Sequence, residues 1–380
     1  MSFSLDEVGY LSAHAARIAE VAPQVELTKA SVFADRALLE REFGSSARAV
    51  SALLAARRAS EGKFPEWWLT DADAAQQATP RRVADIRAQR VAAAGAACAH
   101  DVTCSVGSEA PSFAANGVAW LGSDIDRARL AMARFNLGAD AWLAVADALA
   151  PVSRADVVVA DPARRAGGRR ITDPAKLLPP LPDLLAANKS RELAVKCAPG
   201  IDYSTWDGLV SLVSVDGGVK EACLYTPGFG RGREAVVLRQ GFTERCHFSQ
   251  PACAPAASPG KYIVEPDGAV VRAGLVNHWA TSHGLWMLDE HIAFCTGDAI
   301  PKGYSGFPFA EAVPLKKLKA ALAARQVGSA EILVRGVNVD PDQLRVKLKL
   351  KGPNAAGVVI ARIGERAVAH ICGPREPARD

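Results

Sequence analysis

The sequence has little that would place the protein in a membrane or on a secretory route. No apolar run in its 380 residues approaches the roughly 20 that a membrane-spanning helix needs. Residues 1–7 contain no basic segment followed by an apolar stretch, which argues against a signal peptide. We therefore expect a cytoplasmic protein with no membrane partner.

Motifs for metal binding and phosphate hydrolysis are also missing. The eight cysteines include no Cys-x-x-Cys pair, and the seven histidines include no His-x-x-x-His pair. Structural zinc sites have paired ligands a few residues apart, so we expect reduced thiols and no metal site. No Gly-x-x-x-x-Gly-Lys-Ser/Thr loop occurs, so nothing supports a phosphate-hydrolysing enzyme.

The composition is that of a folded protein with an uneven charge. Hydrophobic residues make up 49% and charged residues 23%, and the length suggests two or three domains. The net charge is only +4, yet residues 310–366 carry eleven Lys or Arg against five Asp or Glu. A basic module on a nearly neutral body favours a polyanionic partner, although a solvated charged face would have the same composition.

The pattern along the chain predicts an α/β protein. Between about 99 and 245, short β-rich runs alternate with helical stretches, which is typical of a parallel sheet covered by helices on both faces. Later β-rich runs are closer together and are expected to complete the sheet as antiparallel strands. The predicted segments are a helical cap at 1–98, the alternating domain at 99–248, a Pro/Ala/Ser linker at 249–260, a small mixed segment at 261–309 and a basic α/β domain at 310–380.

Small residues follow the first predicted strand of this domain, which we expect over 101–106. A loop of small residues at that place lets a ligand approach the backbone closely. Its candidate ligand-binding residues are Asp101, Thr103, Ser105 and Gly107.

Acidic residues end the next predicted strands. Asp124, followed by Ile125, is placed to accept hydrogen bonds from ribose hydroxyls, and Asp147, followed by Ala148, is placed at a base edge. Asp161 and Pro162 end the fourth strand. Because the carboxyl ends of parallel strands form one ligand-binding edge, the sequence predicts a nucleoside-cofactor site there, whereas helix caps and loop ends are the structural alternative.

These motifs resemble class I S-adenosylmethionine-dependent methyltransferases, and more narrowly the bacterial methyltransferase-like proteins with a C-terminal THUMP-like domain. The matching stretches are 77–80 with 83–84 and 87, 123–136, 161–170, 195–200, 265–267, 271–275 and 331–337. The resemblance implies a Rossmann-like, seven-stranded methyltransferase sheet, a helical cap, and a small ferredoxin-like and THUMP-like C-terminal module. It also implies S-adenosylmethionine as the cofactor.

The first loop departs from the glycine-rich pattern of that family. Only Gly107 is kept, while Thr103, Ser105 and Ser108 stand where the family has glycine. Their Cβ atoms disfavour positive φ. An RNA-binding protein with a decayed, non-catalytic pocket is therefore an alternative interpretation, and a small-molecule methyltransferase is a third.

The fourth-strand motif indicates the type of methyl transfer. Asp161 is placed to accept a hydrogen bond from an amino group beside the methyl donor, so we predict N-methylation of a base in tRNA or rRNA, with Asp161 and Pro162 as the catalytic residues. Residues 161–170 contain no cysteine, the nucleophile that methylation at carbon 5 of a pyrimidine would need.

Two basic segments are the predicted RNA contacts. Arg164, Arg165, Arg169 and Arg170 follow the fourth strand and would clamp a phosphate, or pair with local carboxylates as a structural alternative. In the last domain, 341–350 is predicted as a short helix after an Asp-Pro cap, although 345–351 also alternates like a strand. The candidate RNA-binding residues there are Lys316, Lys319, Arg345, Lys347 and Lys349.

Overall fold

A computed structural model describes residues 2–163, 165–166 and 169–378, without the side chains of 165–166 and 169–170. The chain divides into two compact units. Unit 1 comprises 1–211 and 220–232, and unit 2 comprises 212–219 and 233–380. No helix among the described residues is both long enough and apolar enough to cross a bilayer.

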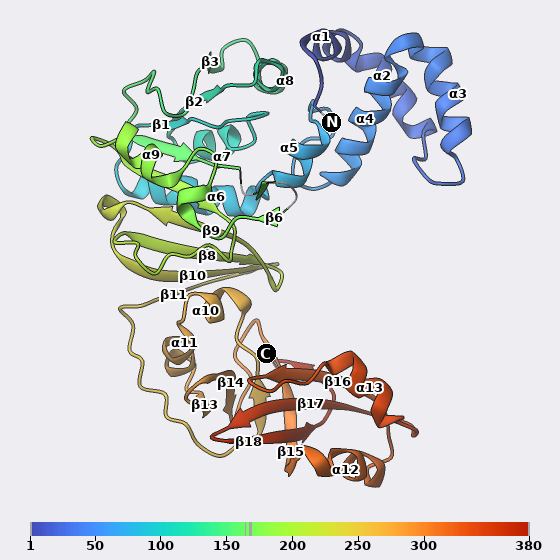
Figure 1. The fold of residues 1–380 in the computed structure, drawn as a ribbon, viewed down its shortest axis with the longest axis vertical. Coiled ribbons are helices and arrows are strands. Elements are labelled where there is room, and N and C mark those ends of the chain that lie inside the picture. The colour runs from blue at the N-terminus through green and yellow to red at the C-terminus, as the bar shows by residue number, and fades with distance from the viewer. Residues whose placement is uncertain (1, 164, 167–168, 379–380) are drawn as a thin grey trace. The chain divides into compact units, whose positions relative to one another are not determined.

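Unit 1 begins with a group of amphipathic helices, drawn in blue in Figure 1. They are α1 (Leu5–Ala13), α2 (Ala15–Val21), α3 (Val32–Phe43), α4 (Ala47–Ala59) and α5 (Ala72–Gln77). In α4, Val50, Leu53 and Leu54 are buried at the spacing of one helical face. They join a core with Leu11 of α1, Ile18 of α2 and other apolar side chains.

The central sheet follows the alternating pattern of the sequence. Its elements are α6 (Arg81–Ala93), β1 (Cys98–Asp101), α7 (Ala110–Ala115), β2 (Ala119–Asp124), α8 (Arg127–Leu137), β3 (Trp142–Val145), β4 (Val157–Ala160), α9 (Leu181–Ala187), β7 (Glu192–Cys197), β8 (Leu209–Val215), β9 (Gly218–Tyr225), β10 (Gly232–Arg239) and β11 (Phe242–His247). A separate hairpin, β5 (Arg165–Ala166) and β6 (Arg169–Arg170), follows β4.

The strand order is β11-β10-β8-β9-β7-β4-β1-β2-β3. Strands β3, β2, β1, β4 and β7 are parallel, and β9 runs antiparallel to β7. Every residue of the central strand β4 is buried, as expected for a parallel strand covered on both faces. The predicted α/β fold, with parallel strands followed by antiparallel ones, is thus confirmed.

Two details of the sheet differ from the predictions. The sheet has nine strands rather than seven, and its edge strand β11 carries the mostly polar sequence Phe-Thr-Glu-Arg-Cys-His, which gives a weak strand signal. The strand predicted over 101–106 is wrong, because β1 ends at Asp101. The chain turns there, since the Thr103 amide donates to the Asp101 carboxylate and Ser105 adopts a positive φ.

The C-terminal part of unit 2 contains a second sheet. Its elements are β12 (Tyr262–Val264), α10 (Gly268–Arg272), α11 (Val276–Ser282), β13 (Trp286–Asp289), β14 (Ile292–Gly297), β15 (Ser305–Pro314), α12 (Leu318–Ala324), β16 (Val327–Arg335), α13 (Pro341–Leu348), β17 (Asn354–Ile363), β18 (Arg366–Cys372) and β19 (Glu376–Pro377). The strand order is β13-β14-β12-β15-β18-β17-β16, and β19 pairs with β15. Strand β15 runs across the predicted boundary at 309.

Alternating side chains of β17 divide the core of this sheet. Val358 and Ile360 pack with residues of α12 and α13, while Val359 and Ala361 join the cluster formed with β12 and β14. Helices α12 and α13 therefore cover the same face of the sheet.

Segment 341–348 is a helix, as predicted. Asp340 caps α13 by accepting from the amides of Asp342 and Gln343, and Pro341 occupies the first turn. The cap explains why a sequence that also alternates like a strand forms a helix.

Candidate active site

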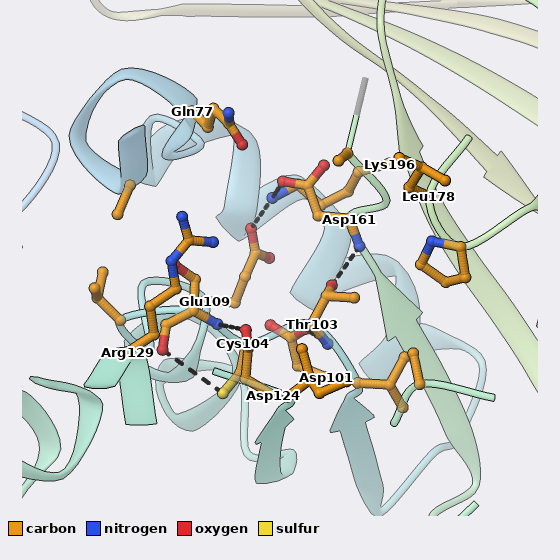
Figure 2. A pocket seen from close by; sticks show the side chains of 18 of the residues that line it. Gln77, Asp101, Thr103, Cys104, Glu109, Asp124, Arg129, Asp161, Leu178 and Lys196 are labelled. Atoms are coloured by element: carbon orange, nitrogen blue, oxygen red, sulfur yellow. Dashed lines mark hydrogen bonds and ion pairs between the residues drawn. The ribbon is translucent and has the colours of Figure 1, made fainter. Parts of the chain in front are cut away.

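A cavity of about 490 Å³ opens at the carboxyl ends of the parallel strands of unit 1. Residues after β1, β2, β3 and β4, together with the end of β7 and α5, line it, and Figure 2 shows Thr103, Asp124, Asp161, Lys196 and Gln77 around it. Its volume lies in the range of small-molecule sites. Strand β1 lies between β4 and β2 in the sheet, the position at which open α/β sheets bind ligands.

Most of the predicted ligand-binding residues meet in this cavity. The lining includes Asp101, Thr103, Ser105, Asp124, Ile125, Asp147, Ala148 and Asp161. Pro162 and Gly107 are not among the lining residues. Gly107 has a φ of +84°, and a Cβ there would lie 2.6 Å from Cδ1 of Leu137. Its observed role is therefore close packing of the loop against α8.

Asp124 holds the first loop in shape. Its carboxylate accepts from the amides of Ser105 and Asp126, both at 2.9 Å. Ser105 has a φ of +51°, the left-handed conformation that favours glycine. The loop thus keeps a glycine-like backbone at this position, at a conformational cost of roughly 1–2 kcal/mol.

Thr103 connects two strand ends, which a glycine cannot do. Its Oγ1 accepts from the amide of Asp161 at 2.6 Å, and its own amide donates to the Asp101 carboxylate at 3.1 Å. The loop after β1 is thereby tied to the loop after β4 (Figure 2). Threonine at this position thus adds a hydrogen bond between two strand ends, which the sequence pattern did not reveal.

A buried chain of charges leads from the cavity into the core. The Lys196 ammonium lies 2.8 Å from Asp161 and 3.2 Å from Glu109. Glu109 lies 2.6 Å from the Arg87 guanidinium, which also contacts Glu221. Only Asp161 is partly exposed, at 21%, whereas the other four side chains are at most 4% exposed.

Sequence reasoning missed this chain. Lys196 stands in the apolar strand Leu-Ala-Val-Lys-Cys, and a single charge in a buried strand is the signal that would have identified it. Glu109, Arg87 and Glu221 come from distant segments, so no local pattern connects them.

Burial and neighbouring charges together set the pKa values of the buried ionisable groups at the cavity. Burial lowers the pKa of Lys196, but the carboxylates of Asp161 and Glu109 outweigh that effect and raise it, so the amine stays charged. Burial raises the pKa of Glu109, yet Arg87 and Lys196 reverse this and hold it low. For Asp101, burial and the neighbouring Glu109 raise the pKa to about 7.

Cys104 also lines the cavity, although no cysteine was considered there. Burial, together with the charges of Asp101 and Asp124, raises the pKa of its thiol well above the usual range. Because the thiolate is the nucleophilic form, this cysteine is poorly suited to attack a pyrimidine ring.

The predicted RNA-binding residues of the C-terminal set do not line the cavity, and the side chains of the arginine set after β4 are not described. Arg164 is outside the described residues, and of the other three arginines only the backbone is described, in the β5–β6 hairpin. The side chains of the C-terminal set are exposed, namely Lys316, Lys319, Arg345, Lys347 and Lys349. Arg345 forms an ion pair of 2.6 Å with Asp342.

The cavity suits an adenosine that carries a positive charge. Asp124 lies at the end of β2, where a carboxylate binds ribose hydroxyls, and Asp147 and Ala148 follow β3 beside it. Among the described side chains that line the cavity, five are acidic and two, Arg129 and Lys196, are basic. The carboxylates of Asp124 and Asp147 favour a positively charged sulfonium ligand over an anionic one. The described residues contain no cluster of three or more His, Cys, Asp or Glu arranged to hold a metal ion.

Comparisons with known proteins agree with this arrangement. Residues 305–374 match the THUMP domain-like family. An uncharacterised S-adenosylmethionine-dependent methyltransferase of Mycobacterium tuberculosis strain CDC 1551 is 42% identical over 355 residues, covering 88% of this chain and 98% of the relative, and its counterpart in strain H37Rv matches equally. The crystal structure of a candidate methyltransferase from Porphyromonas gingivalis W83 superposes with a TM-score of 0.72 at 17% identity, covering 98% of this chain and 99% of that one.

The sequence relatives establish the activity and the cofactor, and the solved structure establishes the fold. The chain belongs to the family of S-adenosylmethionine-dependent methyltransferases represented by these mycobacterial proteins, with a THUMP-like domain at its C-terminal end.

Proposed function

We propose that this methyltransferase acts in the cytoplasm on RNA, and that it methylates an exocyclic amino group of a base in tRNA or rRNA. The observation that carries the proposal is Asp161, a carboxylate at the end of β4 that lines the cofactor cavity and is partly exposed. A carboxylate in that place can accept a hydrogen bond from an amino group and aim its lone pair at the methyl donor.

The cofactor supplies an activated methyl group, and the chain supplies binding and orientation. Asp124 would hold the ribose hydroxyls, and the loop around Ser105 would pass close to the amino-acid part. Asp161 would orient the acceptor amino group and take up the proton that its nitrogen loses. The protonated thiol of Cys104 argues against a covalent mechanism at a pyrimidine carbon.

The THUMP-like match and the exposed basic helices support RNA as the substrate. Lys316 and Lys319 precede or begin α12, and Arg345 and Lys347 lie in α13, with Lys349 after its end. Exposed lysine and arginine on one covering layer of the sheet suit phosphate contacts, which position RNA without selecting its sequence. A small-molecule methyltransferase would not need them.

The cavity argues against a decayed pocket. Ser105 keeps the left-handed backbone that the glycine-rich loop requires, and Thr103 adds a hydrogen bond between strand ends. Calorimetric titration of the purified protein with S-adenosylmethionine tests this point directly. We expect micromolar binding, and no binding up to millimolar cofactor would restore the alternative of an RNA-binding protein without catalysis.

The activity is tested with methyl-labelled S-adenosylmethionine and total RNA from a strain that lacks the gene. Nucleoside mass spectrometry of the labelled RNA should show a base methylated on an exocyclic nitrogen. Asp161→Ala should keep cofactor binding and lose at least about 100-fold in turnover, since it removes a hydrogen bond formed to the reacting group. Wild-type turnover in this variant would contradict the assigned role.

A further inference from the structure

The strongest unassigned feature is the ion pair between Asp161 and Lys196 in the wall of the cavity. Their charged atoms are 2.8 Å apart, and both side chains line the cavity. In Figure 2 the two side chains point toward each other beside Thr103 and Glu109. The pair therefore places a hydrogen-bond acceptor next to a hydrogen-bond donor.

Both groups have bonding capacity beyond their contact with each other. An ammonium carries three N–H donors, and Asp161 and Glu109 are the carboxylates that it contacts. A carboxylate has about four acceptor positions, more than one ammonium can use, so Asp161 can accept from its protein partners and from a ligand at the same time.

Two further charged residues, Glu109 and Arg87, fix the position of Lys196. Glu109 lies 3.2 Å from its ammonium and is itself bound to the buried Arg87. The two carboxylates keep Lys196 charged, so it is a donor and does not act as a base. A donor fixed in this way selects for a ligand atom with a lone pair and repels an N–H group.

We propose that Asp161 and Lys196 together bind the pairing edge of the acceptor base, through an amino group that lies beside a ring nitrogen with a lone pair. Adenine and cytosine have this pattern on their pairing edge. On the same edge of guanine the amino group lies beside an N–H donor, which would face the ammonium, and uracil has no amino group. This inference rests on the proposed function and narrows its substrate class to adenine or cytosine.

An amino group beside a ring nitrogen with a lone pair would use both Asp161 and Lys196. Asp161 accepts from the amino group that receives the methyl, and Lys196 donates to the neighbouring ring nitrogen. Two adjacent hydrogen bonds fix the plane of the base, whereas a single bond to Asp161 would let it rotate. An enzyme that must place one nitrogen in line with a methyl group gains directly from that constraint.

The first test is the identity of the product formed by the unaltered enzyme. Total RNA from a strain that lacks the gene is methylated with labelled cofactor, digested and analysed by mass spectrometry. Adenosine methylated at N6 or cytidine methylated at N4 supports the inference. Methylated guanosine, methylated uridine or a 2′-O-methyl nucleoside overturns it while leaving RNA methylation intact. Absence of any labelled RNA overturns the proposed function, and the inference with it.

The second test separates the donor of Lys196 from its charge. Lys196→Met removes both, and Lys196→Gln keeps an N–H donor. We expect Lys196→Met to lower kcat/KM for RNA by about 100-fold, and Lys196→Gln to recover part of that loss, because it restores a neutral donor in place of the charged one. Calorimetry should show little change in cofactor affinity.

Lys176→Met serves as the matched control, since Lys176 is an exposed lysine of unit 1 that does not line the cavity. Thermal denaturation identifies variants that fail to fold because Glu109 has lost a buried partner. If Lys196→Met folds and keeps the kcat/KM of the control, the inference is wrong. Equal losses in Lys196→Met and Lys196→Gln also contradict a donor role.

Discussion

Asp101 is expected to make the stability of this methyltransferase depend on pH. Its carboxyl is buried and close to Glu109, and its pKa is raised from 3.8 to about 7. Above pH 4 the unfolded chain loses this proton, while the folded protein keeps it until about pH 7. The folded state therefore binds more protons in this range, and the contribution of Asp101 to stability falls as pH rises.

The magnitude follows from the difference between the two pKa values. One pKa unit corresponds to about 1.4 kcal/mol, so the contribution of Asp101 should fall by about 4 kcal/mol between pH 4 and pH 7 and then level off. Other carboxylates titrate over the same range, so the comparison must be made with a variant that removes this group alone. Asp101→Asn keeps the shape of the side chain and cannot ionise.

The assay is urea denaturation of wild type and Asp101→Asn at pH values between 5 and 8.5. The free energy of unfolding of the variant, relative to wild type, should rise by about 1.4 kcal/mol per pH unit up to pH 7 and then stay constant. Asp140→Asn, at an exposed loop position, is the control and should show no such slope. A difference between Asp101→Asn and wild type that is independent of pH would refute the argument.

Three further predictions concern the cofactor loop and the basic helices. Asp124→Ala should abolish cofactor binding in calorimetry, because it removes the proposed ribose contact and frees the Ser105 amide; retained micromolar binding would contradict it. Ser105→Gly should leave the free energy of unfolding unchanged or raise it by about 1 kcal/mol, since φ at this residue is already positive. Ser108→Gly should lower the free energy of unfolding, because this residue has no positive φ. A larger loss of stability in Ser105→Gly than in Ser108→Gly would be inconsistent with the loop geometry. Replacing Lys347 and Lys349 by Glu should weaken RNA binding and reduce its salt dependence, measured by filter binding at several salt concentrations, and an unchanged salt slope would exclude contact there.

Much of the candidate site was predictable because its residues occupy repeated local positions. Asp124, Asp147 and Asp161 follow or end short apolar runs, and parallel strands bring their carboxyl ends to one edge, whereas Asp101 was placed at the start of its strand and not at its end. The helix over 341–348 was also predictable, since an Asp-Pro cap acts through neighbouring residues alone.

The backbone of the first loop was not predictable from residue type. The sequence shows Ser105 and Thr103 where glycine is expected, and intrinsic preference argues against a left-handed serine. The structure holds Ser105 at positive φ because Asp124, nineteen residues later, accepts its amide hydrogen. A contact between two strand ends overrides the local preference.

The sequence by itself determined the alternating elements, the acidic residues at the strand ends and the basic character of the last domain, because each depends on residue type and spacing within a short segment. Only the tertiary structure brings together the charged side chains of Asp161, Lys196, Glu109, Arg87 and Glu221. They come from five separate segments, and β7 lies between β4 and β9 only in the folded sheet. Charges can be buried there because each one finds its partner across neighbouring strands and the helices that cover them.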